Sequence, residues 1–270
     1  MIQDDVFNEI RNISEVIKKD SIIKNTAIRD GIFGILENRC NVIYYPIPNE
    51  KNRGFHIKRI VNDKLEDFVY INTDKPVSEQ IFAAAHEFGH ICEVADRVWR
   101  DLDLEGKPTV EEEEKITDWF AAEFLMPTNE FRNIFFAHVK ELDVKNNMIR
   151  LDGLIQIIVL IMNDFMVPYE SVRRRLVETK IINKKDADLL ILDKDIAKIV
   201  GLYTKDKNTY MENDTGVKTI SGIRTLIENA ENKSDIDIGL VNKIKKDFEI
   251  EDMTLNKERL QIHIGDGDND

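Results

Sequence analysis

Residues 78–95 constrain the fold more than any other part of this sequence. The apolar residues of this segment recur at helical spacing and gather on one side of a helix when successive residues are placed about 100° apart. His86 and His90 fall almost opposite this stripe, where a histidine that only packs in a core would not lie. The pattern therefore predicts a helix with one buried face and two histidines on the other face. The stripe consists of Ile81, Ala84, Ala85, Phe88, Ile91, Cys92 and Ala95.

Residues 86–90 read H-E-F-G-H, which fits the pattern H-E-x-x-H. A spacing of four places both imidazoles on one helix face, where they can bind one Zn²⁺ ion. Glu87 lies about 100° further round the helix and can activate a water molecule without binding the metal itself. A solvated polar face is the alternative interpretation, and the small neighbours Ala83 and Gly89 weaken it. The motif predicts one zinc ion per chain and Glu87 as the catalytic base.

A catalytic zinc ion normally has three protein ligands, so a further ligand is needed. Thr109–Glu112 form a candidate capping box that begins a second helix. On this helix Glu114 and Asp118 lie on the face that carries small alanines. We expect Glu114 to be the third ligand and Asp118 to accept the outer N–H of a ligating histidine. Glu113 and Glu111 remain alternatives for the third ligand, because the helix dipole also favours an acidic first turn.

The rest of the chain predicts an α+β fold. Two short helices, broken near Asp20, come first, and three stretches rich in β-branched and aromatic residues follow. These stretches, at residues 42–45, 55–61 and 68–71, predict a small three-stranded sheet packed on helices. Helical spacing then continues from Ser78 to about Lys180.

A polar break after Ile182 predicts a domain boundary. We expect a metallopeptidase domain at residues 1–182, a mainly helical accessory region of unassigned function at 183–264, and a disordered tail at 265–270.

Composition excludes several classes of protein. The 38 basic and 51 acidic residues among 270 give a net charge of −13, which disfavours nonspecific or direct binding to nucleic acid. Two cysteines, Cys40 and Cys92, cannot build a disulfide framework. The longest apolar stretch, residues 154–162, is far shorter than the roughly 20 residues of a membrane span, and no leader peptide is visible. We expect a cytoplasmic protein without a membrane partner, and the sequence gives no sign of its oligomeric state.

Two motifs together resemble the ImmA/IrrE metallopeptidases. The first is His86–His90, and the second is the segment 114–127, which reads E-K-I-T-D-W-F-A-A-E-F-L-M-P. The resemblance extends to the strand at 68–72 and to residues 164–176, and it covers roughly residues 20–182. Thr117 and Pro168 depart from the family, which usually has alanine and serine there. Neither departure involves a proposed ligand.

The resemblance implies a gluzincin-like zinc site in a zincin-like α+β peptidase core. It also implies a protein substrate, a helix-turn-helix repressor whose cleavage derepresses phage, mobile-element or stress-response genes. The acidic net charge is compatible with a basic, DNA-binding partner.

Several residues have more than one interpretation. An edge strand near Phe68, Tyr70 and Asn72 is a candidate to hold an extended substrate by strand addition. His138 is either an oxyanion donor or a surface histidine. The segment 157–176 is either a DNA-binding helix-turn-helix with Arg173–Arg175 on phosphate, or a packed helical pair.

Two functions follow from these patterns. The first is a zinc-dependent endopeptidase in which His86, His90 and Glu114 hold the metal. The alternative is a non-catalytic regulator whose metal site is structural and which binds a repressor or DNA. An intact Glu87 favours the enzyme, because a structural site needs no base beside its ligands.

Overall fold

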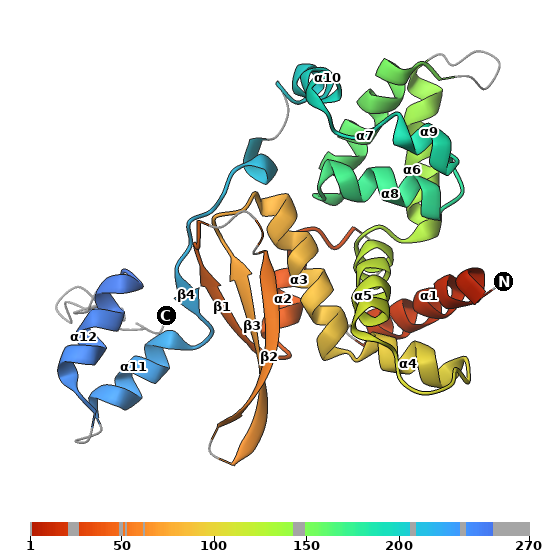
Figure 1. Ribbon diagram of the computed structural model, residues 1–270. Coiled ribbons are helices and arrows are strands. Elements are labelled where there is room, and N and C mark those ends of the chain that lie inside the picture. Colours follow the sequence, from red (N-terminus) through yellow and green to blue (C-terminus); the bar gives the residue numbers. More distant parts are fainter. Residues whose placement is uncertain are drawn as a thin grey trace, which may run out of the picture. The chain divides into compact units, whose positions relative to one another are not determined.

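The computed structural model describes residues 2–20, 27–48, 51, 53–61, 63–142, 149–205, 209–232 and 236–250. These residues form an α+β fold (Figure 1), as predicted. The strands are β1 (Asn41–Tyr45), β2 (Gly54–Val61), β3 (Lys64–Asn72) and β4 (Thr219–Ile220). The helices are α1 (Ile2–Asp20), α2 (Gly31–Glu37), α3 (Val77–Ile91), α4 (Val94–Asp101), α5 (Val110–Leu125), α6 (Thr128–Glu141), α7 (Leu151–Phe165), α8 (Tyr169–Glu178), α9 (Lys184–Asp188), α10 (Lys194–Thr204), α11 (Ile223–Glu231) and α12 (Ile238–Asp247), with a 3-10 turn η1 (Thr209–Glu212).

The strands form one sheet in the order β2-β3-β1-β4. β3 pairs with β2 in antiparallel orientation and with β1 in parallel orientation, so β3 is internal and β2 is an edge strand. The sequence predicted three of these strands. The fourth, β4, is only two residues long and pairs with β1 through Ile43 and Ile220. A strand of that length has too few residues for alternation to reveal it.

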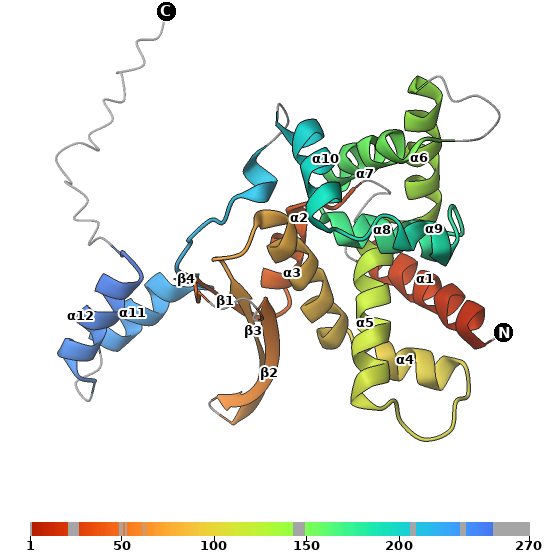
Figure 2. The same ribbon diagram turned by 45° about the horizontal axis from the view of Figure 1, so that its top comes forward.

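Helices cover one face of the sheet. Val42 of β1 lies between more exposed neighbours, whereas the last four residues of β3 are all buried; Val42, Val69 and Ile71 are fully buried. Helix α3 contacts β2 and β3, and α2 contacts both β1 and α3 (Figures 1 and 2). The apolar side chains on this face of the sheet belong to the same core as the apolar stripe of α3.

Helix α7 is a buried core helix, as its apolar sequence predicted. Ile155, Ile158 and Ile161 are fully buried, and Phe165 ends the helix in the same core. Within the described part of the chain no single helix has the length and apolar character needed to cross a membrane; α7 and α8 meet that test only as a pair bent by 104°.

Buried ion pairs attach α8 to α5. The guanidinium of Arg175 is 2% exposed and pairs with Glu123 on α5 and, at 3.1 Å, with Glu178. Arg175 Nε also donates to the carbonyl oxygen of Met126 at 3.0 Å. A buried charge is tolerated only when it is fully partnered, so these contacts fix how α8 sits on the end of α5.

The chain divides into two compact units, Met1–Ser221 and Gly222–Asp270. In the second unit α11 contacts α12. The predicted boundary at residue 182 differs from this division, because residues 183–221 complete the first unit. Leu190 and Met211 are buried in its core, and Val77 N donates to Asn213 O at 2.9 Å. The predicted tail at 265–270 lies outside the described residues.

Candidate metal centre

Helix α3 positions the H-E-F-G-H segment. Ile81, Ala84, Ala85 and Phe88 are fully buried, which places the predicted stripe against the core. The side chains of His86 and His90 are only partly buried and face away from that stripe toward α5. The helix and its two faces are confirmed up to Phe88, but α3 ends at Ile91, so Ala95 of the predicted stripe lies in α4.

Helix α5 begins at the predicted capping box. Thr109 Oγ1 accepts a hydrogen bond from Glu112 N at 3.3 Å, and Glu112 Oε2 accepts one from Thr109 N at 2.9 Å. These two bonds satisfy backbone donors that the first turn leaves unpaired. The cap therefore fixes where the acidic residues of the following turns point.

Gly89 lets α5 approach α3 closely. A Cβ atom built on Gly89 would lie 2.8 Å from Thr117 Cγ2 and 2.9 Å from Phe120 Cδ1, which is closer than packed carbon atoms approach. The missing side chain brings the acidic turns of α5 level with the two histidines. The fourth position of the H-E-x-x-H motif thus has a packing role of its own.

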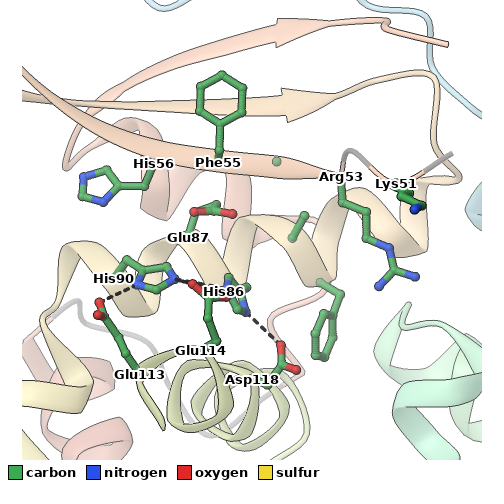
Figure 3. A pocket seen from close by; sticks show the side chains of 13 residues that line it. Lys51, Arg53, Phe55, His56, His86, Glu87, His90, Glu113, Glu114 and Asp118 are labelled. Atoms are coloured by element: carbon green, nitrogen blue, oxygen red, sulfur yellow. Dashed lines mark hydrogen bonds and ion pairs between the residues drawn. The ribbon is translucent and has the colours of Figure 1, made fainter. Parts of the chain in front are cut away.

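Three candidate ligand atoms converge between the helices (Figure 3). His86 Nε2 and His90 Nε2 are 3.2 Å apart. Glu114 places Oε2 at 3.2 Å from His86 Nε2 and Oε1 at 3.4 Å from His90 Nε2. These three residues form a group that could hold a metal ion, with ligand atoms all within 4.8 Å of one another.

Carboxylates hold the outer nitrogen of each imidazole. His86 Nδ1 lies 2.9 Å from Asp118 Oδ1, and His90 Nδ1 lies 3.1 Å from Glu113 Oε1 (Figure 3). Because a carboxylate accepts a hydrogen, each contact favours the tautomer with its hydrogen on Nδ1 and a lone pair on Nε2. Both inner nitrogens are thereby turned toward Glu114 as acceptors.

A converging set of acceptors needs a positive charge at its centre. Two Nε2 lone pairs and a carboxylate repel one another at these distances unless a proton or a cation lies between them. Two ligands about 2.0–2.1 Å from a tetrahedral zinc ion lie about 3.3 Å apart, which matches the separations here. The donor set, two imidazoles and one carboxylate, is also one that zinc favours. The residues present therefore fit a zinc ion.

The surrounding charges act differently on the two histidines. Burial opposes the charged form of His86, but the hydrogen bond to Asp118 and the nearby carboxylates outweigh it and raise its pKa. Burial and the neighbouring His86 lower the pKa of His90 in spite of Glu113. In the metal-free protein a proton is thus favoured at His86.

Glu87 lies beside the centre in a cleft of about 510 Å³. Burial raises the pKa of Glu87 to about 7. A Cβ atom on Gly54 would lie 3.5 Å from Glu87 Oε1, so the backbone of β2 passes directly over this carboxylate. The cleft therefore brings together a buried carboxylate, a candidate metal site and an edge strand.

The comparison with known families agrees with this site. Residues 37–177 match the IrrE N-terminal-like domain family of peptidases, Peptidase_M78. The chain belongs to this family. The match includes both α3 and α5 and ends in α8, so the M78 family domain contains every residue of the candidate centre.

No curated protein matches the chain. A solved structure, a Mycobacterium tuberculosis transcriptional regulator, is similar at 14% identity with a TM-score of 0.43. The similarity covers 65% of this chain and 51% of that structure, so the chain spans about half the length of that relative.

One expectation about this M78 domain is wrong. The strand that contains Phe68, Tyr70 and Asn72 is not an edge strand, because β2 and β1 occupy both of its sides. The Tyr70 hydroxyl donates to the carbonyl oxygen of Tyr45 at 2.8 Å, and the Asn72 amide bonds to the backbone of Ile47. Tyr70 and Asn72 are buried, so they support the sheet, and the edge beside the cleft belongs to β2.

Three arginines and a histidine outside the cleft have structural partners. Arg173 pairs with Glu170, and Arg175 is buried in the ion pairs described above. Only Arg174 of the three is largely exposed, which favours the packing interpretation of this segment over phosphate binding. His138 bonds through Nε2 to Asp164 Oδ2 at 2.7 Å and does not line the cleft.

Three residues of this site have roles that the sequence did not predict. Glu113 was an alternative ligand, whereas its carboxylate contacts the outer nitrogen of His90. The fit of Gly89 against α5 could have been suspected from its place inside the motif. His56 had no recognisable partner in the sequence, yet it lines the cleft and contacts Asp67.

Proposed function

We propose that this M78 family member is a zinc-dependent endopeptidase in which His86, His90 and Glu114 hold the metal. The observation that carries the proposal is the convergence of His86 Nε2, His90 Nε2 and the Glu114 carboxylate, with pairwise contacts of 3.2–3.4 Å, beside the buried carboxylate of Glu87. A bound zinc ion would polarise the peptide carbonyl and make a nearby water molecule more acidic.

Glu87 serves as the general base. It accepts a proton from water as the water oxygen bonds to the carbonyl carbon, and it returns that proton to the peptide nitrogen as the C–N bond breaks. The buried position of Glu87 suits this role, because a carboxylate removed from bulk water is a stronger base.

Asp118 and Glu113 position the imidazoles. Each holds an Nδ1 atom, so that neither ring can rotate its Nε2 atom away from the centre. Such supporting carboxylates also make the ligating nitrogen more basic. Glu111 is exposed, and none of the contacts that hold the two histidines involves it, which favours Glu114 as the third ligand.

The substrate lies in extended form along β2. An edge strand leaves backbone N–H and C=O groups free to pair with another chain. Because Gly54 brings this strand over Glu87, a peptide paired with β2 would pass within reach of the base. Extended binding requires the cleaved segment to be unfolded or in a linker.

We assign the substrate to the helix-turn-helix repressors that the family resemblance implies. The net charge of −13 supports a basic partner, because opposite net charges speed association. DNA-binding repressors carry such basic surfaces.

Incubation of the zinc-loaded protein with repressors encoded near its gene tests the proposal. Discrete fragments should form with the wild type and not with Glu87→Gln, which keeps the size of the side chain. Glu130→Gln is a matched control: burial also raises the pKa of Glu130, but this residue lies on α6 and does not line the cleft. Equal cleavage by wild type and Glu87→Gln would overturn the catalytic assignment.

A further inference from the structure

His56 is a histidine of the edge strand that reaches the cleft. It pairs in register with Val69, a fully buried residue of the helix-covered face, and its side chain is 13% exposed. Figure 3 shows His56 on the His90 side of Glu87, while Phe55 points away from α3. His56 lines the same cleft as Glu87 and His90. Strand alternation thus places the imidazole of His56 in the cleft, at the end where His90 lies.

A carboxylate fixes the orientation of this imidazole. His56 Nε2 lies 2.6 Å from Asp67 Oδ1, a residue of β3 on the same face of the sheet. Among the described residues, Nδ1 of His56 has no hydrogen-bond partner. When the ring is protonated, Nε2–H is donated to Asp67 and a second N–H remains at Nδ1.

Peptide hydrolysis creates a need for such a donor. Addition of water puts negative charge on the carbonyl oxygen, and a preorganised donor at that position lowers the barrier. Arg53, a cation that also lines the cleft, is less suitable. The side chain of Arg53 is 59% exposed, and its Nε atom pairs at 3.0 Å with Glu79. Glu79 lies in the first turn of α3, before the turn that carries His86.

We infer that His56 is a catalytic residue that donates a hydrogen bond to the carbonyl oxygen of the cleaved peptide as negative charge develops on it. Asp67 is a positioning residue that holds the ring. This inference rests on the proposed peptidase function. Because His56 belongs to the strand that would pair with the substrate, binding along β2 also brings the reacting carbonyl group beside it.

The chain contains a matched control for His56. His138 also contacts an aspartate, Asp164, at 2.7 Å, and its side chain is 17% exposed. The two histidines therefore share a partner type and a similar burial, but His138 lies outside the cleft. Replacement of His138 reports what loss of a histidine–aspartate contact does to the fold alone.

Binding of a transition-state mimic tests the inference with the zinc-loaded full chain. The probe is a phosphinic tripeptide, Phe-(PO₂CH₂)-Ala-Phe, whose tetrahedral anion replaces the scissile peptide, and acetohydroxamate serves as a reference that needs only the metal. His56→Phe should weaken binding of the phosphinic peptide by about 100- to 1,000-fold. Zinc content and acetohydroxamate affinity should not change. His138→Phe should bind both probes like the wild type.

Turnover gives a second readout. With any repressor that the wild type cleaves, His56→Phe should lower kcat by the same factor and leave KM unchanged. His56→Gln retains a neutral donor and should recover part of the loss, while Asp67→Asn should have a smaller effect than His56→Phe.

Each outcome decides between the two claims. Unchanged phosphinic affinity in His56→Phe would overturn the role of His56, and so would a wild type that binds acetohydroxamate but not the phosphinic peptide. An active Glu87→Gln would instead overturn the proposed function. Loss of zinc in His56→Phe would show that His56 supports the metal and not the carbonyl oxygen.

Discussion

Asp118 Oδ1 lies 2.9 Å from His86 Nδ1, on the opposite side of the ring from the Nε2 atom that faces Glu114. This contact joins α5 to α3 at the candidate metal centre. It fixes the hydrogen of the imidazole on its outer nitrogen and leaves the inner nitrogen free as a ligand.

Asp118→Ala should therefore weaken zinc binding by about 10- to 100-fold. Titration with a competing chelator measures the affinity. Asp164→Ala is the control, because Asp164 makes the equivalent contact to His138 away from the cleft, and it should keep the wild-type affinity. Equal zinc affinities in the two variants would show that Asp118 does not support the metal site.

Gly89→Ala should disturb the contact between α3 and α5. The new methyl group would meet Thr117 Cγ2 at 2.8 Å and Phe120 Cδ1 at 2.9 Å, and both side chains are buried. Overpacking of this kind lowers the free energy of unfolding by about 1–3 kcal/mol, and the shift of α5 should weaken zinc binding as well. Urea unfolding and zinc titration measure the two effects.

Gly201→Ala is the matched control, because a Cβ atom at Gly201 in α10 meets nothing within 4 Å. It should raise the free energy of unfolding by up to about 1 kcal/mol, since alanine favours helix. Adding Thr117→Ala to Gly89→Ala should recover part of the loss. A free energy of unfolding equal to that of the wild type in Gly89→Ala would show that α3 and α5 can move apart to accommodate the methyl group without loss of stability.

Lys18 should make stability depend on pH. It is a buried residue of α1 whose ammonium lies 5.2 Å from the ring centre of Phe124, and burial lowers its pKa to about 8. In the unfolded chain the pKa returns to about 10.4. Between these values the unfolded state binds more protons, so the free energy of unfolding rises with pH.

Lys18→Met should abolish this rise. The free energy of unfolding of the wild type minus that of the variant should grow by about 3 kcal/mol from pH 7 to pH 10.5, following the pKa difference. The exposed neighbour Lys19, replaced by methionine, should show no such trend. Denaturant unfolding across this pH range measures the difference, and a flat profile would contradict the burial of the ammonium.

Truncation should locate the end of the folded peptidase unit. A chain that ends after Ser221 keeps β4 and should retain its zinc and melting temperature. A chain that ends after Ile182 loses Leu190, Ile196 and Met211 from the core. Each such side chain contributes about 1.5–3 kcal/mol when buried, so most of the stability should be lost. If the chain that ends after Ile182 melted at the same temperature as the chain that ends after Ser221, the predicted boundary at residue 182 would be correct.

Local patterns in the sequence were enough to predict the two helices of the site. The apolar stripe of α3, the capping box of α5 and the spacing from Glu114 to Asp118 each depend on residues within a few turns. That Asp118 supports one of the two histidines could also be predicted, because facing helix surfaces follow from helical periodicity; that this histidine is His86 comes from the structure.

Contacts between distant segments could not be predicted in the same way. Whether β3 is internal depends on its pairing with β1 across an intervening hairpin, and β4 pairs with β1 from more than 170 residues away. The contact of His56 with Asp67 depends on the register of β2 with β3. Such placement is set by the tertiary fold and leaves little signal in local composition.

The zinc content of the purified protein tests the central claim most directly. Elemental analysis should find about one zinc ion per chain in the wild type, since the site has a single set of three ligands. The double variant His86→Ala/His90→Ala should contain none, and Glu114→Gln should bind zinc more weakly than Glu113→Gln. Full zinc occupancy in the double variant would contradict the assignment of the metal to this site.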